Sequence, residues 1–176
     1  MPPPYARLKD PASYVPPRIV RTSRLDLCPA SVDDAAAVAQ ARGESHAELV
    51  PWFHGTMGNP GHERDARWQS ERLAEAVEAA QRRERLSYLA WASGVCVGAV
   101  DLIPQWRRGQ FRLSYWVRSG HAAPNTASAG LARTLGFRQI ACQPLGYEMP
   151  DGLLVDGIAY AIEDIAVLPP LKVAWA

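Results

Sequence analysis

The sequence has little of what marks metal sites and disulfide frameworks. Its three cysteines, Cys28, Cys96 and Cys142, lie far apart and form no Cys-x-x-Cys pair. That spacing indicates neither a zinc site nor a set of disulfides. We expect each cysteine to be a small, apolar, interior residue in a reducing compartment, and we expect no bound metal.

Long hydrophobic runs and an excess of charge are also missing. No stretch approaches the roughly 18 apolar residues of a membrane span, and the opening MPPPYARLKDP lacks the apolar core of a signal peptide. The 19 Lys and Arg residues nearly balance the 18 Asp and Glu residues, which is unlike the basic footprint of a nucleic-acid binder. We therefore expect a cytoplasmic protein that binds neither membranes nor nucleic acids.

What the sequence does contain is enough apolar material for one core. The chain has 176 residues, 48% of them hydrophobic, with 15 prolines and 13 glycines, which favours one domain built of many short elements. Residues 1–17 are rich in proline, and we expect an extended arm there. The domain itself is predicted over residues 18–165, followed by a tail over residues 166–176.

The first half of the domain reads as a strand followed by helices. Residues 18–28 have the character of a strand, and Ser31 is placed to cap a helix that Gly43 would end. Residues 49–63 are rich in turn formers, which predicts a loop, either on the surface or above a pocket. Residues 64–83 have the apolar period of a helix.

The centre of the chain predicts a three-stranded antiparallel meander. Residues 86–92 are apolar on both faces, and Ser93-Gly94 is a turn signal before a strand over residues 95–102. Residues 110–117 alternate as a strand does. One face would carry Phe111, Leu113, Tyr115 and Val117, and the other Gln110, Arg112, Ser114 and Trp116.

The last part predicts one helix and two strands. Asn125 can cap the helix, and Gly136 stands where a left-handed residue ends it. Strands are expected over residues 137–142 and 157–163, with two Asp-Gly turns in the segment between them.

Six segments, taken in order, resemble one family. They are RTSRLDLCPASVDDA, LVPWF, LAWASGVCVGAVDL, LSYWV, NTASAGLARTLGF and LLVDGIAYAI. On these segments the chain is similar to the acetyl-CoA-dependent N-acyltransferases of the GNAT superfamily, in particular to the RimJ/RimL-like branch, whose known members acetylate the amino termini of ribosomal proteins. Ser114 stands where the family usually has glycine, and the family's aromatic-basic pattern after the last Asp-Gly is absent. The resemblance implies an α+β fold: a mixed, mostly antiparallel sheet flanked by helices.

One departure from the family pattern is large. In the family, a glycine-rich phosphate-binding turn, a long helix and a fifth, parallel strand follow the fourth strand. This chain has only seven residues, 118–124, between Val117 and Asn125. A helix and a strand together take roughly 25 residues or more. We therefore expect the fold to lack the central crossover helix and strand.

The resemblance implies a reaction and a set of site residues. A primary amine attacks the acetyl-CoA thioester directly, without a covalent acyl-enzyme. The backbone of Trp116 and Val117 would bind the pantetheine arm and polarise the carbonyl, and Asn125 would contact the same arm. Arg118 would partly replace the missing phosphate donors. Ser128 matches the position close to the coenzyme sulfur, where a hydroxyl can protonate the leaving thiolate.

The general base and the acceptor pocket stay open at this stage. Asp101, His54 and Glu148 are candidates for the base, and a relay through water is an equal alternative. Trp52, Tyr115 and Asp101 could line the acceptor pocket. Each of these residues also has an ordinary structural role, because aromatic residues fill cores and Asn or Ser residues cap helices.

Two hypotheses of different classes follow. The first is an N-acetyltransferase that acts on a protein amino terminus or a small amine. The second is a catalytically inactive binding or assembly module that keeps part of the fold. Loss of the fifth strand would leave strand edges that a second copy of the chain could close, by swapping or by forming a homodimer.

Overall fold

The computed structural model describes residues 15–53, 57–106, 110–117, 126–148, 152–161 and 174–175. The chain divides into two compact units. Unit 1 comprises Met1–Glu44, Asn59–Arg118 and Lys172–Ala176, and unit 2 comprises Ser45–Gly58 and Ser119–Leu171.

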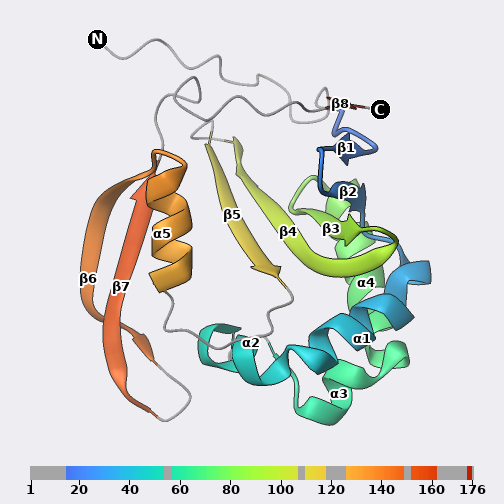
Figure 1. Cartoon of the computed structure of the whole chain (residues 1–176), viewed down its shortest axis with the longest axis horizontal. Coiled ribbons are helices and arrows are strands. Elements are labelled where there is room, and N and C mark those ends of the chain that lie inside the picture. Colours follow the sequence, from blue (N-terminus) through green and yellow to red (C-terminus); the bar gives the residue numbers. More distant parts are fainter. Residues whose placement is uncertain are drawn as a thin grey trace. The chain divides into compact units, whose positions relative to one another are not determined.

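Unit 1 contains a six-stranded sheet with the order β5-β4-β3-β2-β1-β8, in which every neighbouring pair is antiparallel (Figure 1). The predicted meander is confirmed as β3, β4 and β5, although β4 extends three residues further than expected. Ser93 and Gly94, both with positive φ, form the tight turn between β3 and β4. The strands are β1 (Val20–Arg21), β2 (Asp26–Pro29), β3 (Leu86–Ala92), β4 (Val95–Gln105), β5 (Gln110–Val117) and β8 (Ala174–Trp175).

The prediction of one strand over residues 18–28 is wrong. The segment forms β1 and β2, which pair with each other, because Thr22 closes a turn between them. The hydroxyl oxygen of Thr22 accepts hydrogen bonds from the backbone N–H groups of Arg24 and Leu25, at 3.2 and 2.9 Å. The same hydroxyl donates to the carbonyl of Leu25. A side chain that bonds its neighbours' backbone in this way favours a turn over an extended strand.

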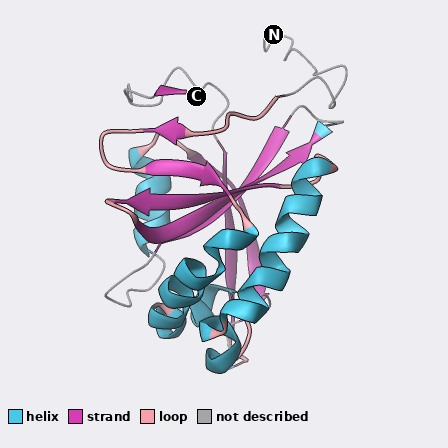
Figure 2. Cartoon of the chain, turned by 90° about the vertical axis from the view of Figure 1, so that its right-hand side faces the viewer, coloured by secondary structure: helices cyan, strands magenta, loops and turns pink. Residues whose placement is uncertain are grey.

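Helices pack against the sheet of unit 1 and complete its core (Figure 2). A 3-10 turn, Val32–Asp34, begins the layer. Ser31 caps it, as the sequence predicts, and the side chain of Asp34 completes a capping box. The helices of this layer are α1 (Ala35–Glu44), α3 (Pro60–Arg64) and α4 (Ala66–Gln81). Their buried side chains form one cluster with the sheet: Ala35, Val38, Ala41, Leu73, Leu89 and Cys96.

Two details of the predicted helical segments are corrected by the structure. Gly43 does not end the first helix but lies inside α1, where a methyl group would overlap Cγ of Arg64. The expected loop over residues 49–63 contains the end of α2 (His46–Phe53), which belongs to unit 2, and most of α3. Turn-forming residues misled the prediction because Asn59 and Pro60 serve as the cap and first residue of a helix.

Unit 2 contains α5 (Thr126–Thr134) and a two-stranded sheet of β6 (Arg138–Glu148) and β7 (Leu154–Ala161). The helix ends as the sequence predicts, with Gly136 in the left-handed region at φ 82°. The N–H of Phe137 donates to the carbonyl of Ala132, and the N–H of Gly136 donates to that of Arg133. This pair of hydrogen bonds is a Schellman motif, which satisfies two carbonyls at the end of the helix.

The two strands of unit 2 are longer than predicted, and one of the two predicted turns is wrong. The segment Asp156-Gly157 lies inside β7, and only Asp151-Gly152 falls between the strands. The register shifts between Gln143 and Tyr147, and the carboxylate of Asp156 accepts a hydrogen bond from the N–H of Leu145 at 3.1 Å. Asp156 is therefore used to satisfy an irregular part of β6 rather than to make a turn.

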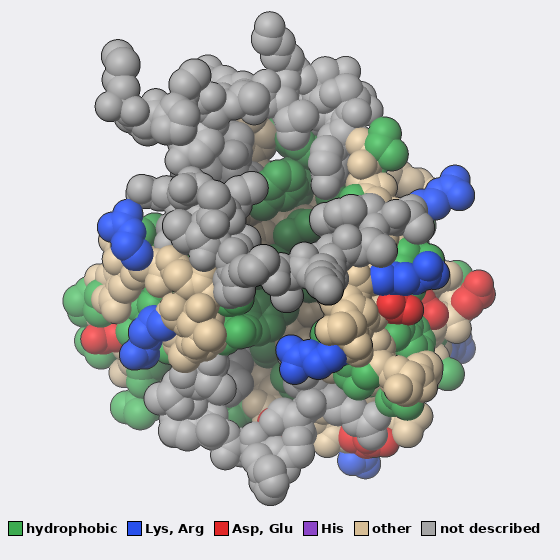
Figure 3. Space-filling model, turned by 45° about the horizontal axis from the view of Figure 1, so that its top comes forward, with side chains coloured by type: hydrophobic (Ala, Val, Ile, Leu, Met, Phe, Trp, Pro, Cys, Tyr) green, Lys and Arg blue, Asp and Glu red, His purple; other side chains and the backbone are tan. Residues whose placement is uncertain are grey.

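The connection between the units agrees with the expected departure from the family. β5 ends at Val117 and α5 begins at Thr126, which leaves residues 118–125 for the connection. This is too short for the long helix and the crossover strand that the family has there, which together take roughly 25 residues or more. Within the described ranges, no helix is long and apolar enough to cross a bilayer. Among the side chains that the structure describes, basic groups are scattered over the face shown in Figure 3.

Candidate functional site

The C-terminal end of β5 is the part of unit 1 to which the sequence assigns the thioester. Trp116 is paired with Ala99 and Val117 with Gly98, so two small residues of β4 lie beside this end of the strand. In the strand order of the described residues, β5 is at the outer edge of the sheet and has β4 as its neighbour. Alternate residues of an antiparallel strand direct their N–H and C=O groups to opposite sides. Part of the β5 backbone is therefore directed away from the sheet.

The predicted acceptor residues Asp101 and Tyr115 lie on opposite faces of this sheet. Asp101 is paired with Ser114, two residues from Trp116, so its side chain shares a face with Trp116. Tyr115 is paired with Val100 and stands on the other face. The structure therefore brings Asp101, and not Tyr115, to the face on which Trp116 packs.

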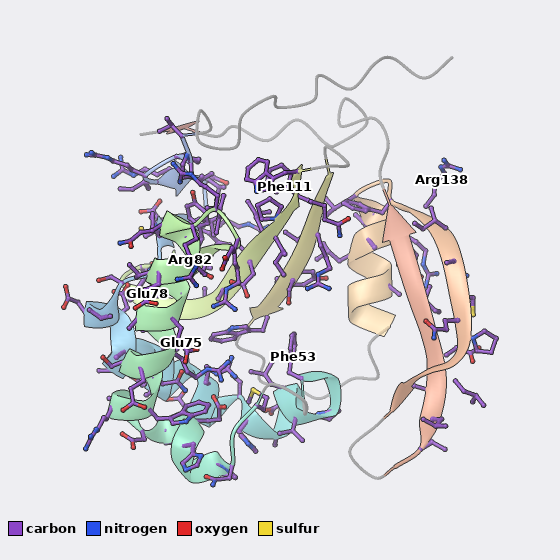
Figure 4. The ribbon with its side chains drawn as sticks, turned by 180° about the vertical axis from the view of Figure 1, so that it is seen from behind. Phe53, Glu75, Glu78, Arg82, Phe111 and Arg138 are labelled. Carbon is purple, nitrogen blue, oxygen red and sulfur yellow. The ribbon has the colours of Figure 1, made fainter. Side chains whose placement is uncertain are left out.

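The face that carries Tyr115 is apolar along β5 and partly open. Phe111 and Leu113 occupy this face and are 43% and 49% exposed. Phe111 lies at the end of β5 far from Trp116 (Figure 4), where its ring makes an edge contact with Trp106 at a centroid distance of 5.9 Å. The indole N–H of Trp106 donates to the carbonyl of Arg83 at 3.0 Å, which fixes this aromatic pair to the end of α4.

Trp116 has a different environment, between the core and a charged group. Its side chain packs against the core cluster of α1, α4 and the sheet. The guanidinium carbon of Arg42 lies 5.5 Å from the centroid of the Trp116 ring, which is the geometry of a cation–π contact. Arg42 belongs to α1, so this contact links the helical layer to the end of β5.

Arg42 is held by a buried carboxylate. Its Nε pairs with Oε2 of Glu63, and the two side chains are only 12% and 0% exposed. The side-chain amide of Gln69 donates to the same Oε2 at 3.0 Å and to the backbone carbonyl of Glu63 at 3.1 Å. Burying a charge is costly unless it is paired and hydrogen-bonded, and Glu63 satisfies both conditions. The three residues come from α1, α3 and α4.

A second arginine, Arg72, lies in the field of this cluster. Loss of water around its guanidinium lowers the pKa of Arg72, and the positive charge of Arg42 lowers it further, against the opposing effect of Glu63. Arg72 also lies over the ring of Trp68, at 4.8 Å from its centroid. The helical layer therefore contains two arginine–tryptophan contacts, of which only that of Arg42 reaches β5.

Sequence reasoning missed this cluster, although part of a signal was present. In α4, the polar Gln69 is buried together with Leu73 and Ala76, whereas the apolar Ala66 is exposed. Gln69 stands four residues before Leu73, so the helical period alone places it on the buried face. A buried glutamine needs polar partners, which would have pointed to a neighbouring carboxylate.

The other predicted site residues are only partly described. The structure gives the backbone of Trp52 in α2, Val117 in β5, Ser128 in α5 and Glu148 in β6, but not their side chains. Arg118, Asn125 and His54 lie outside the described residues.

Comparisons with known proteins identify the fold. No protein-family model matches the sequence, and no curated protein matches it significantly. Solved structures do match: RimL, a ribosomal L7/L12 alpha-N-protein acetyltransferase in complex with coenzyme A, aligns with a TM-score of 0.67 at 16% identity, over 81% of this chain and 96% of that chain. RimJ of Mycobacterium smegmatis, in complex with CoA-disulfide, aligns with a TM-score of 0.70 at 20% identity, over 83% and 87% of the two chains. A ribosomal-protein-S5-alanine acetyltransferase from Vibrio fischeri gives a TM-score of 0.68 at 14% identity, over 83% and 97%.

These matches place the chain in a structural class. It has the fold of the RimJ and RimL acetyltransferases, the GNAT fold, and the expected α+β architecture with a mostly antiparallel sheet flanked by helices is confirmed. The fold implied by the sequence motifs is thus confirmed by structures that share few residues with this chain.

Proposed function

We propose that this protein is an acetyl-CoA-dependent N-acetyltransferase that acts on a primary amine, either a protein amino terminus or a small amine. The observation that carries the proposal is the position of Trp116 and Val117: the end of β5, at the outer edge of the sheet, opposite Ala99 and Gly98. The fold is shared with acetyltransferases whose structures contain coenzyme A.

The edge of β5 can accept an extended ligand as a further strand accepts a neighbour. The pantetheine arm carries amide groups, and amides bond to an open strand through backbone N–H and C=O groups. Gly98 and Ala99, the partners of Val117 and Trp116, belong to β4 on the inner side of β5, so the ligand is expected on the outer side of this strand. A backbone N–H directed at the thioester carbonyl would stabilise the negative charge that develops on its oxygen.

The reaction then needs two proton transfers. The amine nitrogen attacks the thioester carbon, so that a C–N bond forms and the C–S bond breaks. A base removes one proton from the resulting ammonium, and an acid returns one to the coenzyme thiolate. Ser128 is the proposed acid. Asp101, which shares the face of Trp116, is a candidate base together with His54, Glu148 and a water relay.

Fewer residues of this chain are available to bind the phosphate groups of the coenzyme than to bind its pantetheine arm. Enzymes with the complete fold hold pyrophosphate in consecutive backbone N–H groups at the start of a helix, and residues 118–125 are too few to build that unit. Arg118 and Asn125 are the proposed remaining contacts. Most of the affinity should therefore come from the acetyl-pantetheine portion.

The activity is tested by measuring release of coenzyme thiol from acetyl-CoA with a panel of peptides and small amines. We expect Ser128→Ala to lower kcat by about a hundredfold, the smaller end of what a positioned acid contributes, with little change in acetyl-CoA affinity. Thr134→Ala is the matched control, because it removes an exposed hydroxyl from the last turn of the same helix. If no amine in the panel supports thiol release by the unaltered protein, the enzymatic proposal is wrong.

A second candidate function is favoured by the arrangement of strands. In the described part of the chain, β5 ends one sheet and β6 and β7 form a sheet of two strands. Such edges can be closed by a second copy, which would make the protein an inactive assembly module. Light scattering of the purified protein measures its oligomeric state, and the thiol-release assay measures its activity. A monomer that turns over acetyl-CoA contradicts this second candidate.

A further inference from the structure

The residue pair that links the helical layer to the end of β5 is Arg42 and Trp116. Arg42 lies in the last turn of α1, and its guanidinium carbon lies 5.5 Å from the centroid of the indole ring. The Trp116 side chain also packs on the core cluster. The ring is therefore located by contacts of two kinds, apolar packing and a cation.

The cation is itself held in place. Glu63, fully buried, binds Nε of Arg42, and Gln69 donates two hydrogen bonds to Glu63, one to its carboxylate and one to its carbonyl. A solvated arginine samples many rotamers, whereas this one is tied to α3 and α4. A buried ion pair is weak evidence for stability, since apolar residues of similar size often serve as well. Its position against Trp116 therefore calls for a role other than stability.

We propose that Arg42 is a positioning residue for the acyl donor. It fixes the Trp116 ring and, through it, the backbone of Trp116 and Val117 at the outer edge of β5. This inference rests on the proposed function, because it is this backbone that would bind and polarise the thioester. An edge strand is supported by hydrogen bonds on one side, so a side-chain anchor at its end limits its motion.

The variant that tests this must not leave a buried charge alone. Removing Arg42 by itself would strand the Glu63 carboxylate in the core, and the protein could simply unfold. The double variant Arg42→Met and Glu63→Gln removes both charges together. The Glu63→Gln change keeps the backbone carbonyl and a side-chain oxygen for the Gln69 amide, and methionine fills the volume of the arginine stem. Arg42→Lys serves as the conservative variant, because it keeps a cation over the ring.

The structure offers a matched control in Arg72→Met. This change removes a guanidinium from the Trp68 ring, a second arginine–tryptophan contact of the same helical layer, without touching β5. We expect the double variant to bind acetyl-CoA about tenfold more weakly, the loss expected for a desolvated cation–π contact, and Arg72→Met to bind as the unaltered protein does. Arg42→Lys should recover most of the affinity.

A second readout does not depend on the ligand. In the ligand-free protein, hydrogen exchange at the one of the two adjacent amides, Trp116 or Val117, that is bonded to β4 should be faster in the double variant than in Arg72→Met, while the amides of β3 stay protected. Equal exchange at β5 together with equal acetyl-CoA affinity in the two variants would overturn the inference and leave the proposed function intact. If the unaltered protein binds no acetyl-CoA, the proposed function fails, and the role of Arg42 for an acyl donor fails with it.

Discussion

Cys142 is exposed, and a neighbouring carboxylate sets the chemistry of its thiol. The expectation that each cysteine is an interior residue is therefore wrong for it. Its Sγ lies 3.7 Å from Oδ2 of Asp156, across the pair of strands β6 and β7. Partial loss of water, the negative charge of Asp156 and the contact with its carboxylate all raise the pKa of the Cys142 thiol. A raised pKa means less thiolate at any pH below it, and the thiolate is the reactive form.

Asp156→Asn should therefore make Cys142 react faster. Removing the negative charge lowers the thiol pKa, so the rate of alkylation by iodoacetamide at pH 8 should rise severalfold, and the pH midpoint of the rate should move down. Mass spectrometry of the modified peptide measures both. Asparagine still offers an oxygen to the N–H of Leu145, so β6 should keep its shape. Asp33→Asn, an exposed carboxylate of unit 1, is the control and should leave the rate unchanged.

At the scale of single residues, the sequence identifies types of side chain better than their partners. Trp116 could be placed in the last strand of the meander from the sequence, but its contact with Arg42 could not be predicted, because the two residues are distant in the chain and meet only in the folded unit. The same holds for Glu63, which looks like a solvated acid in a loop and is in fact completely buried. Only the helical spacing of Gln69 from Leu73 gave a local sign of the polar cluster formed by Arg42, Glu63 and Gln69.

At the scale of elements, the close approach of α1 and α3 depends on Gly43. The glycine is buried inside α1, and its carbonyl accepts a hydrogen bond from Arg64 at 3.4 Å. A Cβ at this position would overlap Cγ of Arg64, so the arginine would have to move and its contact would be lost. Helix propensity alone favours alanine over glycine by about 1 kcal/mol, in the opposite direction.

Gly43→Ala should therefore destabilise the protein by about 1–3 kcal/mol, as overpacking does, despite the better propensity of alanine. Equilibrium unfolding in urea measures the change. Gly130→Ala in α5 is the matched control, because among the described residues no atom lies within 4 Å of a Cβ added there. That variant should be neutral or stabilised by up to about 1 kcal/mol. A Gly43→Ala protein as stable as Gly130→Ala would mean that the two helices do not approach each other as described.

The elements that the sequence predicted well are those with strong local signals. The meander of β3, β4 and β5 has clear alternation and an obvious turn, and α5 has a glycine at the one place where a left-handed residue is needed. The predictions were wrong where one sequence motif is compatible with two kinds of structure. Asn59-Pro60 reads as a turn and begins a helix, and Asp156-Gly157 reads as a turn and lies in a strand because Asp156 bonds the bulged Leu145 instead.

At the scale of the whole molecule, the fold and the shortened connection must be explained together. The chain has the GNAT fold, with TM-scores of 0.67 and 0.70 to RimL and RimJ structures, yet it passes from β5 to α5 within residues 118–125. The strand that we propose for the acyl group is present among the described residues, and residues 118–125 are too few for the long helix and strand that follow it in the family. Ligand recognition should therefore be concentrated on the pantetheine half of the coenzyme.

The shortened connection between β5 and α5 could be predicted from the sequence, because it depends only on the number of residues. Eight or fewer residues cannot supply a long helix and a crossover strand, which together take roughly 25 residues or more, whatever their composition. The acceptor amine, in contrast, could not be predicted, since it depends on side chains that different elements bring together. Asp101 and Tyr115 illustrate this, because adjacent strands place them on opposite faces of the sheet.

Isothermal titration with acetyl-CoA and with acetylpantetheine, which lacks the nucleotide and its phosphates, tests the central claim most directly. If the outer edge of β5 binds the thioester arm without a phosphate-binding turn, both ligands should bind, with dissociation constants within about tenfold of each other, a difference of about 1.4 kcal/mol or less. No detectable heat with either ligand at millimolar concentration would contradict the account.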